Sequence, residues 1–178
     1  MFKTIITAVI LTGITLFGAQ NAPVSAAPVK TFTLTAKGQP AITAKDLPDG
    51  MLFEGYGGKP VLLNFFGKNC RYCMREIPHL VALKKKYGNR IGIIGMHVQQ
   101  RMSDGERFML QKRLGFNYPI YEYTDNIEFV RYVGARAGFT GSIPFNIVFD
   151  GKGKVVQIIP GYLGEKDLEM IFSDLLKR

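Results

Sequence analysis

The chain has 178 residues, of which 47% are hydrophobic and 21% charged, a balance typical of a globular protein and not of a disordered one. The length fits a single domain with a sizeable core. Two cysteines exclude a disulfide-dense scaffold and a four-cysteine zinc site. A net charge of +9 would suit a nucleic-acid partner only if the cations gathered on one face.

The first residues have the pattern of a secretory signal peptide. Lys3 supplies a basic start, and Ile5–Ala19 is largely apolar but shorter than the roughly 20 residues that a spanning helix needs. The small residues Val24-Ser25-Ala26 supply a cleavage site, so we expect residues 1–26 to be removed. The alternative is an anchor that stays uncleaved.

Either outcome exports the domain, which we expect to span residues 27–178 and to lie in the periplasm or another extracytoplasmic compartment. Such a compartment permits disulfides and makes genomic nucleic acid an improbable partner. We expect a monomer without a bound cofactor.

The first half of the domain contains three predicted strands. Residues 30–35 alternate polar and apolar side chains, as a half-buried strand does. Residues 46–58 are rich in Gly and Pro, and we expect them to be irregular. Residues 60–66 and 90–98 are apolar on both faces, which is typical of buried strands.

Four helices are predicted. The first runs from Cys70 to about Tyr87, with an internal Pro78 that should kink it. A capping box of Ser103 and Glu106 begins a second helix that ends near Leu114. A third spans residues 125–133, and Asp125 and Glu128 form a second capping pattern at its start. The last helix carries an apolar stripe of Leu168, Ile171, Phe172, Leu175 and Leu176.

Three further strands complete the pattern. Residues 118–121 form a short strand, and residues 145–149 and 155–159 form a hairpin around Asp150-Gly151-Lys152-Gly153. Alternating strands and helices imply a parallel sheet core, to which the hairpin adds antiparallel strands. The sequence therefore predicts an α/β fold with a mixed central sheet and helices on both faces.

The chemistry is predicted at Cys70-Arg71-Tyr72-Cys73, which follows a buried strand and opens a helix. A cysteine at a helix N-terminus faces free backbone N–H groups and the positive end of the helix dipole, and both favour the thiolate. Lys68 and Arg71 add positive charge nearby, whereas Tyr72 shapes the surface between the cysteines. We expect Cys70 to be the nucleophile and Cys73, shielded within the helix, to resolve the mixed disulfide.

Other interpretations of the two cysteines remain open. An inert disulfide would close only a four-residue loop and add little stability. A copper(I) site could recruit other soft or imidazole ligands, although their spacing supports no ligand pair. Those residues are Met74, His79, Met96 and His97. A pair of reduced, buried thiols is the third interpretation. We expect His79 and His97 to be structural or exposed.

These residues resemble the thioredoxin superfamily, in particular the TlpA/ResA/CcmG-like thiol-disulfide oxidoreductases of the bacterial cell envelope. Residues 58–66 look like the strand that enters the active site, and Cys70, Cys73, Glu76 and Pro78 fit the pattern C-x-x-C-x-x-E-x-P. The resemblance implies a thioredoxin-like fold. It also implies that the segment from about Gln99 to Tyr123 is the extra helix and strand of this subfamily.

The resemblance assigns further roles. It implies that Pro144 is cis and packs against the disulfide, and that the backbone of Ile143 pairs with a bound substrate strand. Glu76 is the candidate proton acceptor for Cys73, because Asn64 stands where thioredoxin has its buried acid. Asn69 replaces the Trp that the family usually has, which leaves the surface beside the first cysteine more polar.

The function implied by the resemblance is an exported disulfide reductase. Its partners would be a membrane electron donor or acceptor and envelope proteins with cysteine pairs, such as apocytochrome c or a copper-binding protein. An oxidase or isomerase is the alternative, because Arg71 beside the nucleophile favours the reduced form and makes the pair more oxidising. A copper(I) carrier is the alternative from another class.

Overall fold

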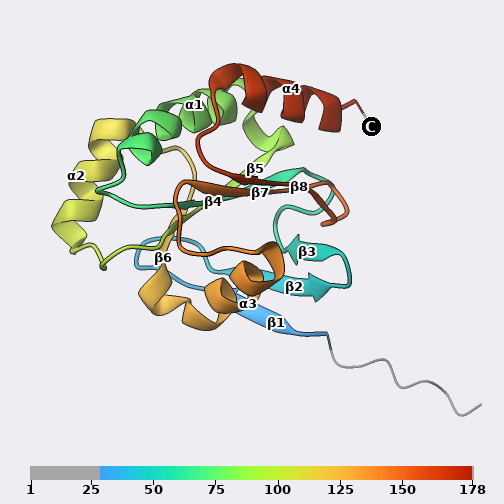
Figure 1. The fold of residues 1–178 in the computed structure, drawn as a ribbon, viewed down its shortest axis with the longest axis horizontal. Coiled ribbons are helices and arrows are strands. Elements are labelled where there is room, and N and C mark those ends of the chain that lie inside the picture. Colours follow the sequence, from blue (N-terminus) through green and yellow to red (C-terminus); the bar gives the residue numbers. More distant parts are fainter. Residues whose placement is uncertain (1–28, 178) are drawn as a thin grey trace, which may run out of the picture.

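The computed structural model describes residues 29–177, so the predicted signal peptide lies outside the described residues. Within this range the chain forms two sheets and four α-helices (Figure 1). The strands are β1 (Thr31–Leu34), β2 (Ile42–Leu47), β3 (Gly50–Phe53), β4 (Val61–Phe66), β5 (Gly92–His97), β6 (Ile120–Glu122), β7 (Phe145–Phe149) and β8 (Val155–Pro160). The helices are α1 (Arg71–Tyr87), α2 (Asp104–Leu114), α3 (Ile127–Ala137) and α4 (Glu165–Leu175).

The central sheet has five strands in the order β6-β5-β4-β7-β8. β4, β5 and β6 are parallel, whereas β7 and β8 are antiparallel to their neighbours. β4 lies in the middle, where every residue is buried, as its apolar sequence predicts. The predicted mixed sheet is therefore confirmed.

Helices cover both faces of this sheet. In Figure 1, α1 and α4 lie on one face, and α3 lies on the other together with β1, β2 and β3. α1 and α4 are joined by Glu169, which accepts hydrogen bonds from Lys86 at 2.6 Å and from the Tyr87 hydroxyl at 3.0 Å. The buried apolar side chains of the described residues form three clusters, and the third includes Cys73 together with residues of α1 and α2.

The small sheet corrects the expectation for residues 46–58. β2 and β3 pair antiparallel across a turn of only two residues, Pro48 and Asp49. Pro48 thus lies in a tight turn between two short strands, while residues 54–58 after β3 are irregular as expected. A Cβ atom on Gly50 would lie 1.9 Å from the carbonyl oxygen of Gly153, so only glycine fits this close approach.

The start of α3 also differs from the expectation. Asn126, not Asp125, precedes the helix, and no side chain caps it. The Asn126 amide is bound elsewhere, since it accepts the N–H of Thr35 at 3.0 Å and donates to the Glu122 carbonyl at 2.8 Å. The predicted Asp125–Glu128 cap is therefore wrong, because Asp125 pairs with Arg101 of a distant segment and no side chain caps the helix.

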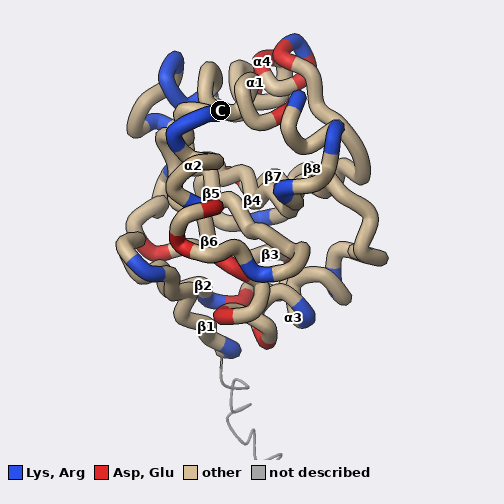
Figure 2. The backbone as a smooth tube through the Cα atoms, turned by 90° about the vertical axis from the view of Figure 1, so that its left-hand side faces the viewer, with Lys and Arg blue, Asp and Glu red and all other residues tan. Residues whose placement is uncertain are grey.

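The other predicted elements lie close to their expected positions. α1 continues through Pro78 to Tyr87, and α2 begins with the predicted capping box of Ser103 and Glu106. α2 and β6 occupy the segment predicted as a subfamily insertion, an assignment that remains a prediction. The charged residues of both signs are interspersed along the tube in Figure 2.

Candidate redox site

The two cysteines lie where the middle of the sheet meets the first helix. Cys70 is the residue before α1, and Cys73 lies in its first turn. A disulfide joins them, and the sulfur of Cys70 accepts the N–H of Cys73 at 3.1 Å. Cys73 is only 1% exposed, whereas Cys70 is partly exposed. An incoming sulfur can therefore reach Cys70 more easily than Cys73, and the roles of the two cysteines in exchange remain a prediction.

A second loop closes the site opposite the cysteines. The Ile143–Pro144 peptide bond is cis, as the resemblance implies, and Pro144 is buried directly before β7. The carbonyl oxygen of Ile143 lies 3.6 Å from the sulfur of Cys70. This backbone group thus stands beside the sulfur that a substrate would meet, where its role in binding remains a prediction.

Glu76 follows Cys73 by three residues on the buried face of α1 and is 1% exposed. Its Oε2 accepts the N–H of Leu163 at 2.7 Å, and its Oε1 accepts hydrogen bonds from the amides of Asn64 at 2.8 Å and Asn146 at 3.1 Å. Burial raises the pKa of Glu76 to about 7, although these three hydrogen bonds favour the carboxylate. A group with this pKa can accept or release a proton near neutral pH.

The amides around Glu76 come from two neighbouring strands. Asn64 of β4 and Asn146 of β7 are partners in the antiparallel register, and the Asn64 amide also donates to Asn146 at 2.8 Å. Both are buried within strands that are otherwise apolar. Sequence reasoning singled out Asn64 but missed Asn146 and Leu163. The signal for Asn146 was a polar residue inside the apolar run of β7.

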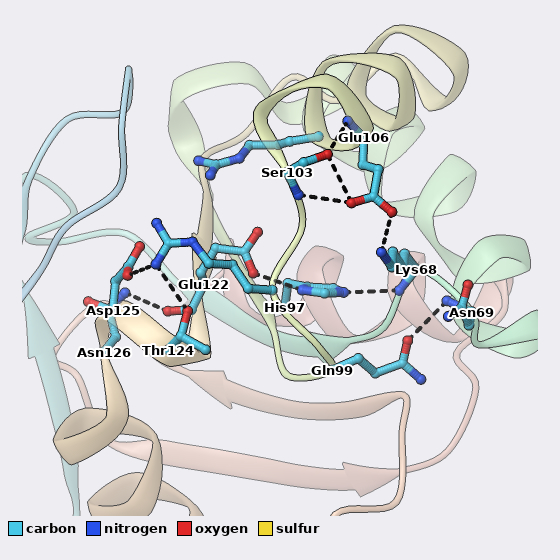
Figure 3. A network of polar contacts seen from close by, with 12 residues as sticks. Lys68, Asn69, His97, Gln99, Ser103, Glu106, Glu122, Thr124, Asp125 and Asn126 are labelled. Atoms are coloured by element: carbon cyan, nitrogen blue, oxygen red, sulfur yellow. Dashed lines mark hydrogen bonds and ion pairs between the residues drawn. The ribbon is translucent and has the colours of Figure 1, made fainter.

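His97 at the end of β5 anchors the loop before the cysteines (Figure 3). Its ring is fully buried, with Nε2 3.2 Å from the backbone nitrogen of Lys68 and Nδ1 2.9 Å from Oε2 of Glu122. The expectation that His97 is structural or exposed missed its contact with this loop. His79 lies apart from this loop, with Nε2 3.0 Å from the hydroxyl of Tyr162.

The three residues expected to influence Cys70, namely Lys68, Arg71 and Tyr72, have different surroundings. Lys68 pairs with Glu106 of α2, which lowers the pKa of Glu106 to about 2, whereas Arg71 and Tyr72 are exposed on α1. The charge of Lys68 is thus partly neutralised, while that of Arg71 faces solvent. The influence of these three side chains on Cys70 remains a prediction.

A groove of about 670 Å³ opens beside the cysteine loop, between Asn69 and α2. Its apolar part includes Met102, Met109 and Leu110, and Lys112 and Arg113 border it. Arg113 also lies 3.7 Å from the sulfur of Met74 on α1, so the groove adjoins the first turn of that helix.

The comparison with family models decides the classification. The model described as the AhpC/TSA family matches residues 26–158, which is most of the chain. The chain belongs to the AhpC/TSA family.

Relatives of this AhpC/TSA chain include two thiol-disulfide oxidoreductases named ResA. The one from Geobacillus kaustophilus is 32% identical over 118 residues, which cover 64% of this chain and 62% of the relative. The one from Bacillus subtilis is 28% identical over 109 residues, which cover 61% and 56%. The match thus spans less than two thirds of the length of these curated relatives.

Solved structures share the fold. A thiol:disulfide interchange protein of the thioredoxin family from Chlorobium tepidum has a TM-score of 0.66 at 23% identity, covering 87% of this chain and 99% of that one. A secreted disulfide oxidoreductase from Mycobacterium tuberculosis has a TM-score of 0.55 at 16% identity, covering 67% and 84%. The fold of this family member is therefore thioredoxin-like, as the resemblance implies.

Two kinds of feature are absent from the described residues. Between residues 29 and 177, no helix is long and apolar enough to cross a membrane. In the same part of the chain, no three His, Cys, Asp or Glu side chains are grouped so that they could hold a metal ion.

Proposed function

We propose that this chain is an exported protein thiol-disulfide oxidoreductase that acts as a disulfide reductase. The observation that carries the proposal is the arrangement of three groups at the start of α1. A partly exposed Cys70 precedes the helix, Cys73 is buried in its first turn, and the carboxyl of Glu76, three residues after Cys73, has its pKa raised by burial to about 7. The names of the ResA relatives support the same chemistry.

The proposed reaction starts from the reduced cysteine pair. The Cys70 thiolate attacks one sulfur of a substrate disulfide, forms a mixed disulfide and releases the first substrate thiolate. Cys73 then gives its proton to Glu76 and attacks the sulfur of Cys70, which releases the second substrate thiolate. Two electrons pass to the substrate, and the chain is left with the Cys70–Cys73 disulfide.

The reductive direction is supported by the pairing of Lys68. Positive charge beside Cys70 stabilises its thiolate and hence the reduced form, which makes the pair more oxidising. Because Lys68 pairs with Glu106, one of the two nearby cations is partly neutralised. Arg71 remains exposed and acts in the opposite direction.

The substrate is proposed to be an envelope protein with a cysteine pair, such as apocytochrome c or a copper-site protein. Its chain would pair with the backbone of Ile143, whose carbonyl lies beside Cys70, and would extend over the groove bordered by Lys112 and Arg113. A membrane electron donor would restore the dithiol. The signal pattern in residues 1–26 supports export.

The test is the equilibrium reduction potential of Cys70–Cys73, measured against dithiothreitol or glutathione. We expect a value near that of thioredoxin, about −270 mV. A value near that of DsbA, about −120 mV, would overturn the reductase direction and favour the oxidase. Tight copper(I) binding without any disulfide exchange would instead favour the carrier.

A further inference from the structure

The loop between β4 and Cys70 is held by two side chains, one at the end of the neighbouring strand β5 and one just after it. The N–H of Lys68 points at Nε2 of His97, at a distance of 3.2 Å, and the N–H of Asn69 donates to Oε1 of Gln99 at 3.0 Å. Figure 3 shows both contacts on the same side of the loop. Two consecutive backbone donors directly before Cys70 are thus satisfied by side chains at or just after the end of β5.

The contacts fix the protonation of His97. A backbone N–H can only donate, so Nε2 accepts and carries no proton. The ring proton therefore lies on Nδ1 and is donated to Oε2 of Glu122, 2.9 Å away. Glu122 thus selects the tautomer of His97 that can hold the amide of Lys68.

Burial of the His97–Glu122 pair costs free energy. His97 is fully buried and Glu122 is 1% exposed, and among the described residues the Oε1 atom of Glu122 has no hydrogen-bond partner. Burying a polar pair of this kind is often no more stabilising than an apolar pair of similar volume. A gain in stability therefore does not account for its position directly behind the loop that presents Cys70.

We propose that His97 and Gln99 are positioning residues for the nucleophile, acting through the amides of Lys68 and Asn69. Neither side chain is placed in contact with sulfur. The loop they hold ends at Cys70, whose sulfur must stay beside the N–H of Cys73 and the carbonyl of Ile143. This inference rests on the proposed thiol-disulfide exchange, which requires the attacking sulfur to lie in line with the bond that breaks.

A pair of substitutions separates positioning from packing. In His97→Gln the side-chain oxygen can reach the place of Nε2 and accept the Lys68 N–H. In His97→Asn the shorter side chain reaches only the place of Nδ1 and keeps only the contact with Glu122. The full chain carrying each change is compared in its reduction of a peptide disulfide, in the pH profile of Cys70 alkylation by iodoacetamide, and in thermal unfolding.

We expect His97→Asn to lower kcat between about 10- and 100-fold and to shift the alkylation profile, whereas His97→Gln stays within a few-fold of the unmodified chain. The proposal would be overturned if both variants kept the wild-type rate and alkylation profile. It would also be overturned if both lost activity equally and in proportion to a loss of thermal stability. Absence of exchange in the unmodified chain would instead overturn the proposed function.

Gln99 gives a test that leaves the buried pair intact. Gln99→Leu removes the acceptor for the Asn69 N–H, and Gln99→Glu keeps an oxygen there. We expect a several-fold loss of kcat in the leucine variant. The glutamate variant should lose less, because its oxygen still accepts the Asn69 N–H although its charge disfavours the Cys70 thiolate. If His97→Asn fails to fold, equal rates in the two Gln99 variants overturn the proposal by themselves.

Discussion

The carboxylate of Glu76 accepts the backbone N–H of Leu163 at 2.7 Å, which ties α1 to the segment between β8 and α4. The same carboxylate binds amides from β4 and β7. Glu76 therefore joins α1 to three other parts of the chain. Its proposed role as proton acceptor depends on this buried position, because burial raises its pKa to about 7.

Replacing Glu76 with Gln should slow resolution of the mixed disulfide. The glutamine cannot take the proton of Cys73, so we expect a loss of about 10- to 100-fold near pH 7, at or below the usual range for a lost general base. The measurement is the rate at which a mixed disulfide on Cys70 is released, followed by stopped flow. An unchanged rate in a folded variant would remove Glu76 from the mechanism.

Glu76 should also make stability depend on pH. Its folded pKa lies above the ordinary value of 4.5, so its protonated form favours folding and its ionised form opposes it. The free energy of unfolding of the unmodified chain should therefore fall, relative to Glu76→Gln, as the pH rises from about 4.5 to 7, by up to about 3 kcal/mol. Urea unfolding of both proteins at several pH values measures this difference. Parallel curves would contradict the raised pKa.

The local part of the site was predictable from the sequence, and the long-range part was not. The position of Cys70 before a helix follows from an apolar strand, a short turn and a helical pattern within a few residues. The partners of Glu76 lie 70 residues away at Asn146 and 87 at Leu163, and Glu122 lies 25 residues from His97. Such contacts depend on strand order, which a single sequence leaves open.

Cys73→Ser should trap the physiological partner. Without the buried second sulfur, a mixed disulfide on Cys70 cannot be resolved, so a covalent complex should accumulate. The complex is detected as a band that disappears on reduction, after expression in the exported compartment. Cys70→Ser is the matched control and should trap much less, because Cys73 is 1% exposed. Equal trapping by both variants would contradict the assigned roles.

Charge at the groove should influence the rate at which disulfide peptides with charged flanking residues are reduced. Lys112 borders the groove, so Lys112→Glu should lower kcat/KM several-fold for a disulfide peptide flanked by acidic residues and raise it for one flanked by basic residues. Lys152→Glu, in the turn between β7 and β8, is the control of equal net charge. If both variants changed the rates alike, net charge and not the groove would be responsible.

The pairing of Lys68 with Glu106 should hold down the reduction potential. Glu106→Gln keeps a residue that can complete the capping box of α2, but it frees the charge of Lys68. The Cys70 thiolate then gains stability, so the reduced form is favoured and the potential should rise by roughly 10–30 mV. Adding Lys68→Met to Glu106→Gln removes the freed charge and should reverse the rise. Glutathione equilibration of all three variants, including Lys68→Met alone, measures the coupling, and a rise that persists in the double variant would show that Lys68 does not cause it.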